Sequence, residues 1–352
     1  MIPISVCIIA KNEEAKIARC LQSLQPYSFE IIIVDTGSSD GTKEIAKKYT
    51  NHIYDYKWTD DFSAARNFSL EKASHNWIFI LDCDETIQTL DFEELQYFCL
   101  NLPLAVGSVN RVNITGISPD KDFYTDRTER FFNKKYYHYT GLIHEQLTPL
   151  NGRPFDNLLL QTTLLHDGYL LTEEQRQEKA NRNLTLLIKE IEQESCNPYL
   201  YYQVGKTYES AGNYASAYEY YAKGLTFNPD TELAYVQAMV IGYGRCLLHS
   251  NSPKLALSLK EIRPSFSSSA DFIYLLGLIY KANGMYEEAL EEFSAAVDFE
   301  FANENGANSF LAYYQMGTIF MLDGDIDTAT ACFLTCGDYS PAIDALTQLK
   351  GI

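Results

Sequence analysis

The stretch that most constrains this chain is Trp77–Ile87, WIFILDCDETI. The apolar run Trp77–Leu81 leads directly into three carboxylates, Asp82, Asp84 and Glu85. An apolar run of this length between polar residues indicates a buried strand, although its periodicity also fits a buried helix segment. In open α/β sheets, ligands bind beyond the carboxyl ends of the strands, so the three acids lie where a ligand is expected.

The spacing of Asp82 and Asp84 favours a metal ion. Residues two apart on an extended chain point to the same side, and two carboxylates on one side repel each other unless a cation lies between them. Oxygen ligands of this kind suit Mg²⁺ or Mn²⁺, which commonly contact a substrate phosphate as well. The alternative is an acidic turn without a ligand, since acidic residues often follow strands.

Composition excludes several classes of protein. A chain of 352 residues has a prior of two domains, and a net charge of -19 argues against nucleic acid or an anionic membrane as the main partner. The eight cysteines are scattered without a CxxC pair, which indicates neither a zinc site nor a disulfide framework. No signal-like segment and no apolar run of about 20 residues is present. We therefore expect a reduced, cytoplasmic protein without a membrane span.

The N-terminal part alternates strand-like and helix-like segments. The strand-like runs are Ile4–Ala10, Phe29–Val34, Asn51–Trp58 and the run ending at Leu81, and the helix-like segments lie at 17–24, 43–49 and 60–73. This alternation predicts an α/β domain with a mainly parallel sheet. The polar loops 11–14, 35–40 and 82–85 should then gather at one edge. Neither GxxxxGK[ST] nor GxGxxG occurs, so side chains and a metal ion would hold a nucleotide.

Four blocks in this order resemble family 2 glycosyltransferases of the GT-A fold. They are SVCIIAKNE (Ser5–Glu13), IIIVDTGSSDGT (Ile31–Thr42), DDFSAARN (Asp60–Asn67) and ILDCDE (Ile80–Glu85). The resemblance implies a Rossmann-like GT-A domain that binds a UDP-sugar together with Mg²⁺ or Mn²⁺. The chain departs from the family at Thr36, where many members carry a second acid after the one that corresponds to Asp35.

The same resemblance implies roles for individual residues. Asp35 would contact the uracil or ribose, and Arg66 would hold the base or balance the diphosphate charge. Asp82 would lie near the ribose and the metal, and Asp84 would ligate the metal directly. The residues expected to contact the donor are Ala10, Asn12, Glu13, Asp35, Arg66, Asp82 and Cys83. As alternatives, Asp35 could only cap the Gly37–Gly41 turn, and Arg66 could be a surface ion-pair partner.

The segment Asn101–Tyr169 is expected to complete the sheet, with a strand at Val106–Ile114, and to carry the acceptor-side chemistry. Its R-x-FF, G-x-IHE and H-x-GY blocks are similar to blocks in glycosyltransferases that carry helical repeats. An inverting transfer needs a base within hydrogen-bond reach of the acceptor, and Glu145 is the candidate. The alternatives are that Glu145 pairs with Arg130 or orients His144, which is itself the second candidate for the base.

His166 is the candidate third metal ligand. A neutral imidazole beside the carboxylates of Asp82 and Asp84 suits Mn²⁺. The alternative is a histidine that closes a strand and binds no metal.

The sequence pattern of the C-terminal part predicts tetratricopeptide-like repeats. Glycine, alanine and aromatic residues recur at the spacing of these repeats in series that contain Gly205, Gly277 and Gly317. The gap between the first two series leaves room for a degenerate repeat around Ala234–Phe266. The next gap implies an insertion near Asn303–Asn308. We expect a GT-A domain at 1–170, a helical connector at 171–197 and an all-α repeat domain at 198–352, which Cys332–Ile352 would cap.

This order of domains is similar to that of the sublancin-type peptide S-glycosyltransferases. The resemblance implies a metal-dependent, inverting transfer of a sugar, glucose or a related one, from a UDP-sugar to a cysteine or serine of a peptide or protein that the repeats bind. The repeats are also compatible with a homodimer. Two alternatives stay open, a soluble glycosyltransferase for a cell-surface glycan or lipid-linked acceptor and a non-catalytic repeat scaffold. The absence of a QxxRW block disfavours a processive synthase.

Overall fold

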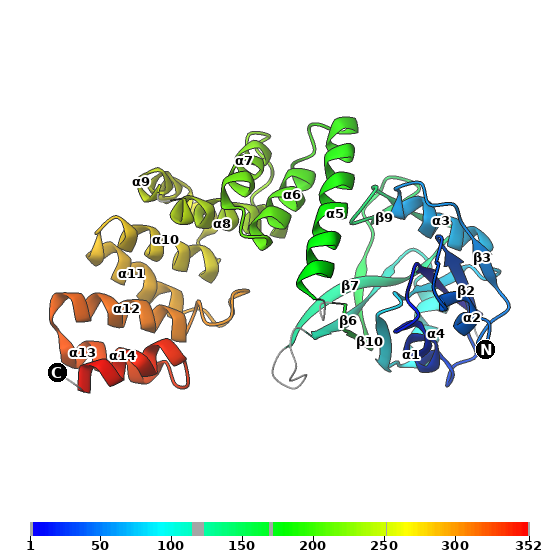
Figure 1. The fold of residues 1–352 in the computed structure, drawn as a ribbon, viewed down its shortest axis with the longest axis horizontal. Coiled ribbons are helices and arrows are strands. Elements are labelled where there is room, and N and C mark those ends of the chain that lie inside the picture. Colours follow the sequence, from blue (N-terminus) through cyan, green and yellow to red (C-terminus); the bar gives the residue numbers. More distant parts are fainter. Residues whose placement is uncertain (1–2, 115–122, 169–171, 251, 351–352) are drawn as a thin grey trace. The chain divides into compact units, whose positions relative to one another are not determined.

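The computed structural model describes residues 3–114, 123–168, 172–250 and 252–350. The chain divides into two compact units, Met1–Leu186 and Leu187–Ile352 (Figure 1). The first is an α/β unit and the second is helical, which confirms the predicted fold class. Within the described ranges, no helix is both long enough and apolar enough to cross a membrane.

The first unit contains the strands and the early helices. The strands are β1 (Ile4–Ala10), β2 (Glu30–Asp35), β3 (Ile53–Asp55), β4 (Trp77–Ile80), β5 (Glu85–Thr89), β6 (Val106–Ile114), β7 (Phe123–Asn133), β8 (Tyr137–Thr140), β9 (Gln146–Pro149) and β10 (Asn157–His166). The helices are α1 (Ile17–Leu24), α2 (Thr42–Ala46), α3 (Phe62–Lys72), α4 (Phe92–Asn101) and α5 (Glu173–Gln193), which ends in the second unit.

Eight strands form one mixed, mostly parallel sheet in the order β3-β2-β1-β4-β7-β6-β10-β5. The neighbours β3, β2, β1 and β4 are all parallel, and so are β6 and β10. Strand β7 runs antiparallel to both of its neighbours, β4 and β6, and β5 runs antiparallel to β10. The parallel half places the carboxyl ends of β1, β2 and β4 at one edge, as predicted. Strands β8 and β9 form a separate pair.

Both faces of the parallel half are covered, which explains the continuous apolar run of β1. Val6 and Ile8 pack in one core cluster with Leu21 of α1, whereas Cys7 between them packs with Leu70 of α3. A strand that is buried on both faces needs apolar residues at every position instead of at alternate ones. This packing fixes where β1 ends and where its polar loop begins.

The end of β4 differs from the prediction. The chain turns after β4, because Glu85 N donates to Asp82 O at 3.0 Å, and β5 begins at Glu85. Asp82 and Asp84 therefore do not lie on an extended chain, and the expectation that they point to the same side is wrong. The cause is the edge strand β5, whose pairing with β10 draws the chain away from the β4 direction.

The second unit is a row of helical pairs. Its helices are α6 (Pro198–Ser210), α7 (Tyr214–Leu225), α8 (Ala234–His249), α9 (Pro253–Ala256), α10 (Ala270–Ala282), α11 (Tyr286–Val297), α12 (Phe310–Asp323), α13 (Ile326–Thr335) and α14 (Ser340–Lys350), with a 3₁₀ helix, η1, at Leu257–Phe266. The degenerate repeat is confirmed, because α9 and η1 stand where one regular helix is expected. Pro264 lies inside η1, and proline is incompatible with the interior of an α-helix. The predicted insertion falls in the irregular segment between α11 and α12.

The repeat glycines lie against aromatic rings of the helix that follows each of them. A Cβ on Gly277 would lie 2.5 Å from Cε1 of the fully buried Phe293. The same contact recurs between Gly205 and Tyr221 and between Gly317 and Phe333. The absence of a side chain at these positions is what lets paired helices approach closely, which is the packing that a repeat array requires.

We predict that Gly277→Ala destabilises the second unit by about 1–3 kcal/mol, because the new methyl group overpacks the ring of Phe293. This is the net change, in which the overpacking outweighs the gain of about 1 kcal/mol that alanine brings to a helix interior. Urea denaturation of the variant, of Phe293→Leu and of the double variant measures the coupling between the two positions. The ring contact is refuted if Gly277→Ala is as stable as the unmodified chain, or if the two changes are additive.

Candidate active site

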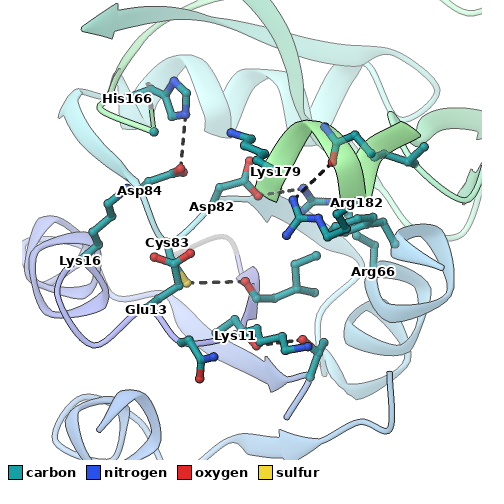
Figure 2. A pocket seen from close by; sticks show the side chains of 18 of the residues that line it. Lys11, Glu13, Lys16, Arg66, Asp82, Cys83, Asp84, His166, Lys179 and Arg182 are labelled. Atoms are coloured by element: carbon teal, nitrogen blue, oxygen red, sulfur yellow. Dashed lines mark hydrogen bonds and ion pairs between the residues drawn. The ribbon is translucent and has the colours of Figure 1, made fainter. Parts of the chain in front are cut away.

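A cavity of about 970 Å³ lies in the first unit, at the carboxyl ends of β1 and β4 (Figure 2). The predicted site residues that line it are Ala10, Asn12, Glu13, Arg66, Asp82, Cys83, Asp84, Glu145 and His166. His144, the second candidate for the base, lines it as well. Asp35 precedes a lining residue, Thr36, and is only 2% exposed. All of the predicted site residues except Asp35 therefore line one cavity.

Arg66 joins the two sides of the cavity. It lies on α3, which begins after Asp61, whose side chain accepts a hydrogen bond from Ala64 N. The Arg66 guanidinium donates from Nε to Glu145 Oε1 at 2.6 Å and from Nη2 to Asp82 Oδ1 at 2.8 Å. Its side chain is buried, so Arg66 is not a surface ion-pair partner. Glu145 pairs with Arg66, whereas the alternative from sequence named Arg130.

Arg130 on β7 holds the other oxygen of Asp82. Its Nη2 donates to Asp82 Oδ2 at 2.8 Å and also to the fully buried Glu85. Burial alone would raise the pKa of Asp82, but the guanidinium groups of Arg66 and Arg130 outweigh it and hold this pKa well below its usual range. Burial has the larger effect on Glu85, whose pKa is raised despite Arg130. Asp82 is thus an ionised anchor between two arginines.

Asp84 points to a different part of the cavity, where it meets His166. Asp84 Oδ2 lies 3.4 Å from His166 Nε2, and His166 Nδ1 lies 2.7 Å from Asn113 Oδ1. Burial opposes ionisation of Asp84, but the hydrogen bond with His166 keeps the pKa of Asp84 below its ordinary value. A Cβ on Gly168 would lie 2.2 Å from Asp84 Oδ2 and 2.4 Å from His166 Nε2. Only glycine at 168 leaves this space open.

Asp84 and His166 fit a divalent metal ion. A carboxylate and an imidazole suit Mn²⁺, and Mg²⁺ is often held by one or two carboxylates with water and substrate phosphates completing its shell. Asp82 is directed to the arginines instead. Within the part of the chain that the structure describes, no group of three or more His, Cys, Asp or Glu side chains is arranged to hold a metal ion. The remaining ligands would therefore come from water and the substrate.

Asp35 caps the turn that follows β2, which is the alternative role considered for it. Its Oδ1 accepts hydrogen bonds from Gly37 N at 3.1 Å and Ser38 N at 2.9 Å, which caps the turn. Its Oδ2 is buried and has no hydrogen-bond partner among the described residues. A buried carboxylate oxygen that lacks a donor is costly, so this atom is a candidate acceptor for a ligand. The neighbouring Thr36 N donates to Ala10 O at 2.9 Å and ties the two strand ends together.

Glu13 is the remaining acid on the β1 side of the cavity. Burial and the nearby charge of Asp84 raise the pKa of Glu13 to about 7. Its main-chain N–H donates to Thr42 Oγ1 at 2.8 Å, which anchors this loop to the start of α2. A bound cation would favour the ionised form of Glu13.

Strained backbone surrounds the cavity. Asn12, Asp60 and His144 have φ of 56°, 59° and 52°, and they are three of the four described non-glycine residues with positive φ. Asn12 and His144 line the cavity directly. Asp60 accepts a hydrogen bond from Nε1 of Trp58, another lining residue, at 2.9 Å. Such conformations concentrate at functional sites, where the surrounding structure holds them in place.

One whole wall of the cavity was not predicted from the sequence. Its residues from α5 are Gln175, Glu178, Lys179, Arg182 and Asn183, and further lining residues that were not predicted are Lys11, Trp58, Phe62 and Arg111. The α5 segment was interpreted only as a connector. The available signal was the spacing of its polar residues by three and four, which puts them on one helical face.

We predict that Asp82→Asn lowers the free energy of unfolding near pH 7 by about 1–3 kcal/mol, because Arg66 and Arg130 each lose a charged partner. The native pKa of Asp82 lies below its ordinary value of 3.8, so this contribution is fully present above that value and is lost as the pH falls below it. The difference from the unmodified chain should narrow below pH 4 or so in urea denaturation. A difference that stays constant down to pH 3, or an equal effect of the exposed Asp156→Asn, would contradict this.

Most of the residues that line the cavity lie in a segment that matches a known family. Residues 5–150 match the family model for glycosyl transferase family 2, and residues 198–231 and 270–303 match that for the tetratricopeptide repeat. Glycosyltransferase SunS of Bacillus subtilis (strain 168) is 27% identical over 288 residues, which cover 77% of this chain and 65% of that protein. The lipopolysaccharide core biosynthesis glycosyltransferase LpsC of Rhizobium meliloti (strain 1021) is 34% identical over 90 residues, which cover 24% of this chain and 33% of that protein.

The chain thus spans less than two thirds of the length of either relative. Among solved structures, MamA from Desulfovibrio magneticus RS-1 matches 49% of this chain and 88% of its own, with 23% identity and a TM-score of 0.39. Both family models agree with the order of units in the structure. The chain therefore carries a glycosyltransferase family 2 domain that is followed by tetratricopeptide repeats.

Proposed function

We propose that this protein transfers a sugar, glucose or a related one, from a UDP-sugar to a cysteine or serine side chain of a peptide or protein, with inversion at the anomeric carbon. The observation that carries the proposal is the arrangement around one cavity, where Asp84 lies 3.4 Å from His166 and Arg66 bridges Asp82 and Glu145. The similarity to SunS, which is named a glycosyltransferase, supports it.

The donor would bind between the ends of β1, β2 and β4. The unpartnered Oδ2 of Asp35 suits the N–H of a uracil, and Ala10, Asn12 and Cys83 line the cavity. Asp84 and His166 would hold Mg²⁺ or Mn²⁺, which neutralises charge on the leaving diphosphate when bound. Asp82, fixed by two arginines, would orient the donor and keep Arg66 in place.

The acceptor would be activated by Glu145. Its carboxylate takes the proton of the acceptor thiol or hydroxyl as the sulfur or oxygen forms a bond to the anomeric carbon. The bond from that carbon to the diphosphate oxygen breaks in the same step, and the nucleoside diphosphate leaves with the electron pair. The hydrogen bond from Arg66 Nε fixes the orientation of Glu145, and the strained backbone at His144 fixes the position of the loop that carries it.

A second candidate differs in the acceptor. LpsC is named for lipopolysaccharide core biosynthesis, which favours a glycan or lipid-linked acceptor for the same donor chemistry. A scaffold without catalysis is a third candidate from another class. The repeats are compatible with a homodimer in each case, which light scattering would measure.

We predict that Asp84→Asn reduces metal-dependent hydrolysis of UDP-glucose at least about 100-fold. The reason is that Asp84 is the carboxylate proposed to hold the metal ion, which neutralises the charge on the leaving diphosphate. Gly168→Ala should reduce it about 10-fold or more, since its methyl group would enter the space between Asp84 and His166. Hydrolysis is measured with Mn²⁺, Mg²⁺ and EDTA, and calorimetry measures UDP binding. The exposed Asp156→Asn serves as the control and should retain the full rate.

If all three variants hydrolyse UDP-glucose at the same rate, the proposal that Asp84 and His166 bind the metal ion is refuted. If the unmodified chain hydrolyses no UDP-sugar, calorimetry decides what remains. Metal-dependent binding of UDP then indicates an enzyme that requires its acceptor, whereas no binding of UDP favours the scaffold.

We predict that deletion of residues 198–352, at the boundary expected for the repeat domain, abolishes sugar transfer to a cysteine-containing peptide substrate but leaves UDP-sugar hydrolysis. The reason is that the repeats would raise the concentration of the acceptor at the active site. Mass spectrometry measures transfer to peptides that carry cysteine, serine or alanine at one position. Retained hydrolysis shows that the shortened protein is folded, and unchanged transfer by it would refute acceptor binding through the repeats.

A further inference from the structure

Two cations on α5 face the cavity. Lys179 and Arg182 are three residues apart, so they lie on one face of this helix. Both line the cavity together with Asp84, His166 and Arg66. Figure 2 shows both side chains extending from α5 into the same space as Asp82. This half of α5 belongs to the first unit, which also contains the rest of the cavity.

The guanidinium of Arg182 packs on the ring of Phe62, the first residue of α3. Its guanidinium carbon lies 5.7 Å from the ring centroid of Phe62, and its Nη2 donates to Asn183 Oδ1 at 3.4 Å. The ring of Phe62 packs edge-on against Trp58, with their centroids 4.8 Å apart. A guanidinium on an aromatic face keeps its edge available for an anion, because stacking uses its plane and leaves its N–H groups in place.

Three further cations on the cavity wall, Lys16, Arg66 and Arg111, lie close to carboxylates. Arg66 binds Asp82 and Glu145, Arg111 binds Asp126 and lies 3.5 Å from Glu85, and Lys16 lies 3.9 Å from Asp167. The wall carries acids as well, including Glu13 and Asp84. A nucleoside diphosphate brings further negative charge, and a divalent ion at Asp84 is already partly balanced by that carboxylate. Binding such an anion therefore requires positive charge from elsewhere on the wall.

We propose that Lys179 and Arg182 bind the diphosphate of the nucleotide donor and stabilise it as the leaving group. The inference rests on the proposed function and extends it, because it makes α5 part of the donor site as well as a connector. Arg182 offers a planar fork of N–H donors that matches phosphate oxygens, and Lys179 offers a mobile point charge one turn away. Neither side chain takes part in a bond that forms or breaks during transfer.

The test compares UDP with uridine, which lacks the phosphates. Calorimetry on the full chain measures the affinity of each ligand for Lys179→Gln, Arg182→Gln and the double variant, in Mn²⁺ and again in EDTA. Each single change should weaken UDP binding about 10-fold and leave uridine binding unchanged, because a hydrogen bond to a charged group is lost. Arg182→Lys should restore part of the UDP affinity. The same fold loss should persist in EDTA, since these side chains act without the metal.

A matched control comes from the same helix. Lys189 is an exposed lysine in the half of α5 that belongs to the second unit, and Lys189→Gln should bind UDP as the unmodified chain does. The inference is overturned if the α5 variants bind UDP normally, or if they lose UDP and uridine to the same extent. The proposed function then still stands, provided that the unmodified chain binds UDP. If the unmodified chain binds neither ligand, the proposed function fails together with the inference.

Discussion

The site depends on one carboxylate shared by two guanidinium groups. Asp82 accepts from Arg66 on α3 and from Arg130 on β7, and these arginines also bind Glu145 and Glu85. Charged groups that are largely removed from water are tolerated only when each has a partner with good geometry. The network therefore ties four segments of the chain to one another, and a shift of any of them would leave a charge unpaired.

The strand order is what makes this network possible. Strand β7 inserts antiparallel beside β4, with Phe131 opposite Phe79, so the preceding residue, Arg130, comes close to the end of β4. Helix α3, whose N-terminus is capped by the side chain of Asp61, delivers Arg66 from the other side. The parallel strands thus bring the loops after β1, β2 and β4 to one edge of the sheet. The antiparallel strand β7 adds the guanidinium of Arg130, which binds Asp82 there.

Much of this was accessible from sequence, but only where local pattern determines structure. The strands β1 and β6 begin and end at the predicted residues, since continuous apolar runs with polar ends leave little choice. The repeats were equally accessible, because Gly277 and Phe293 encode a contact between neighbouring helices that recurs along the chain. In both cases the information lies within a few tens of residues.

What was not accessible depends on distant packing. The turn between Asp82 and Asp84 follows from β5, whose partner β10 lies far along the chain. The pairing of Glu145 with Arg66 depends on how a loop after β8 meets α3. The spacing of the polar residues on α5 indicates one helical face, but Lys179 on an exposed helix is indistinguishable from a solvated lysine until the cavity beside it is known.

The positive φ angles of Asn12, Asp60 and His144 bear on how such a protein would respond to selection for heat tolerance. A left-handed conformation costs a residue such as His144 about 1–2 kcal/mol, which glycine would recover. Stabilising substitutions by glycine are therefore available in or beside the cavity wall, where a freer backbone would loosen the proposed substrate contacts. Selection for thermal tolerance alone would favour glycine at these positions and would lower the turnover rate. Selection for turnover would instead keep the residues with strained positive φ angles.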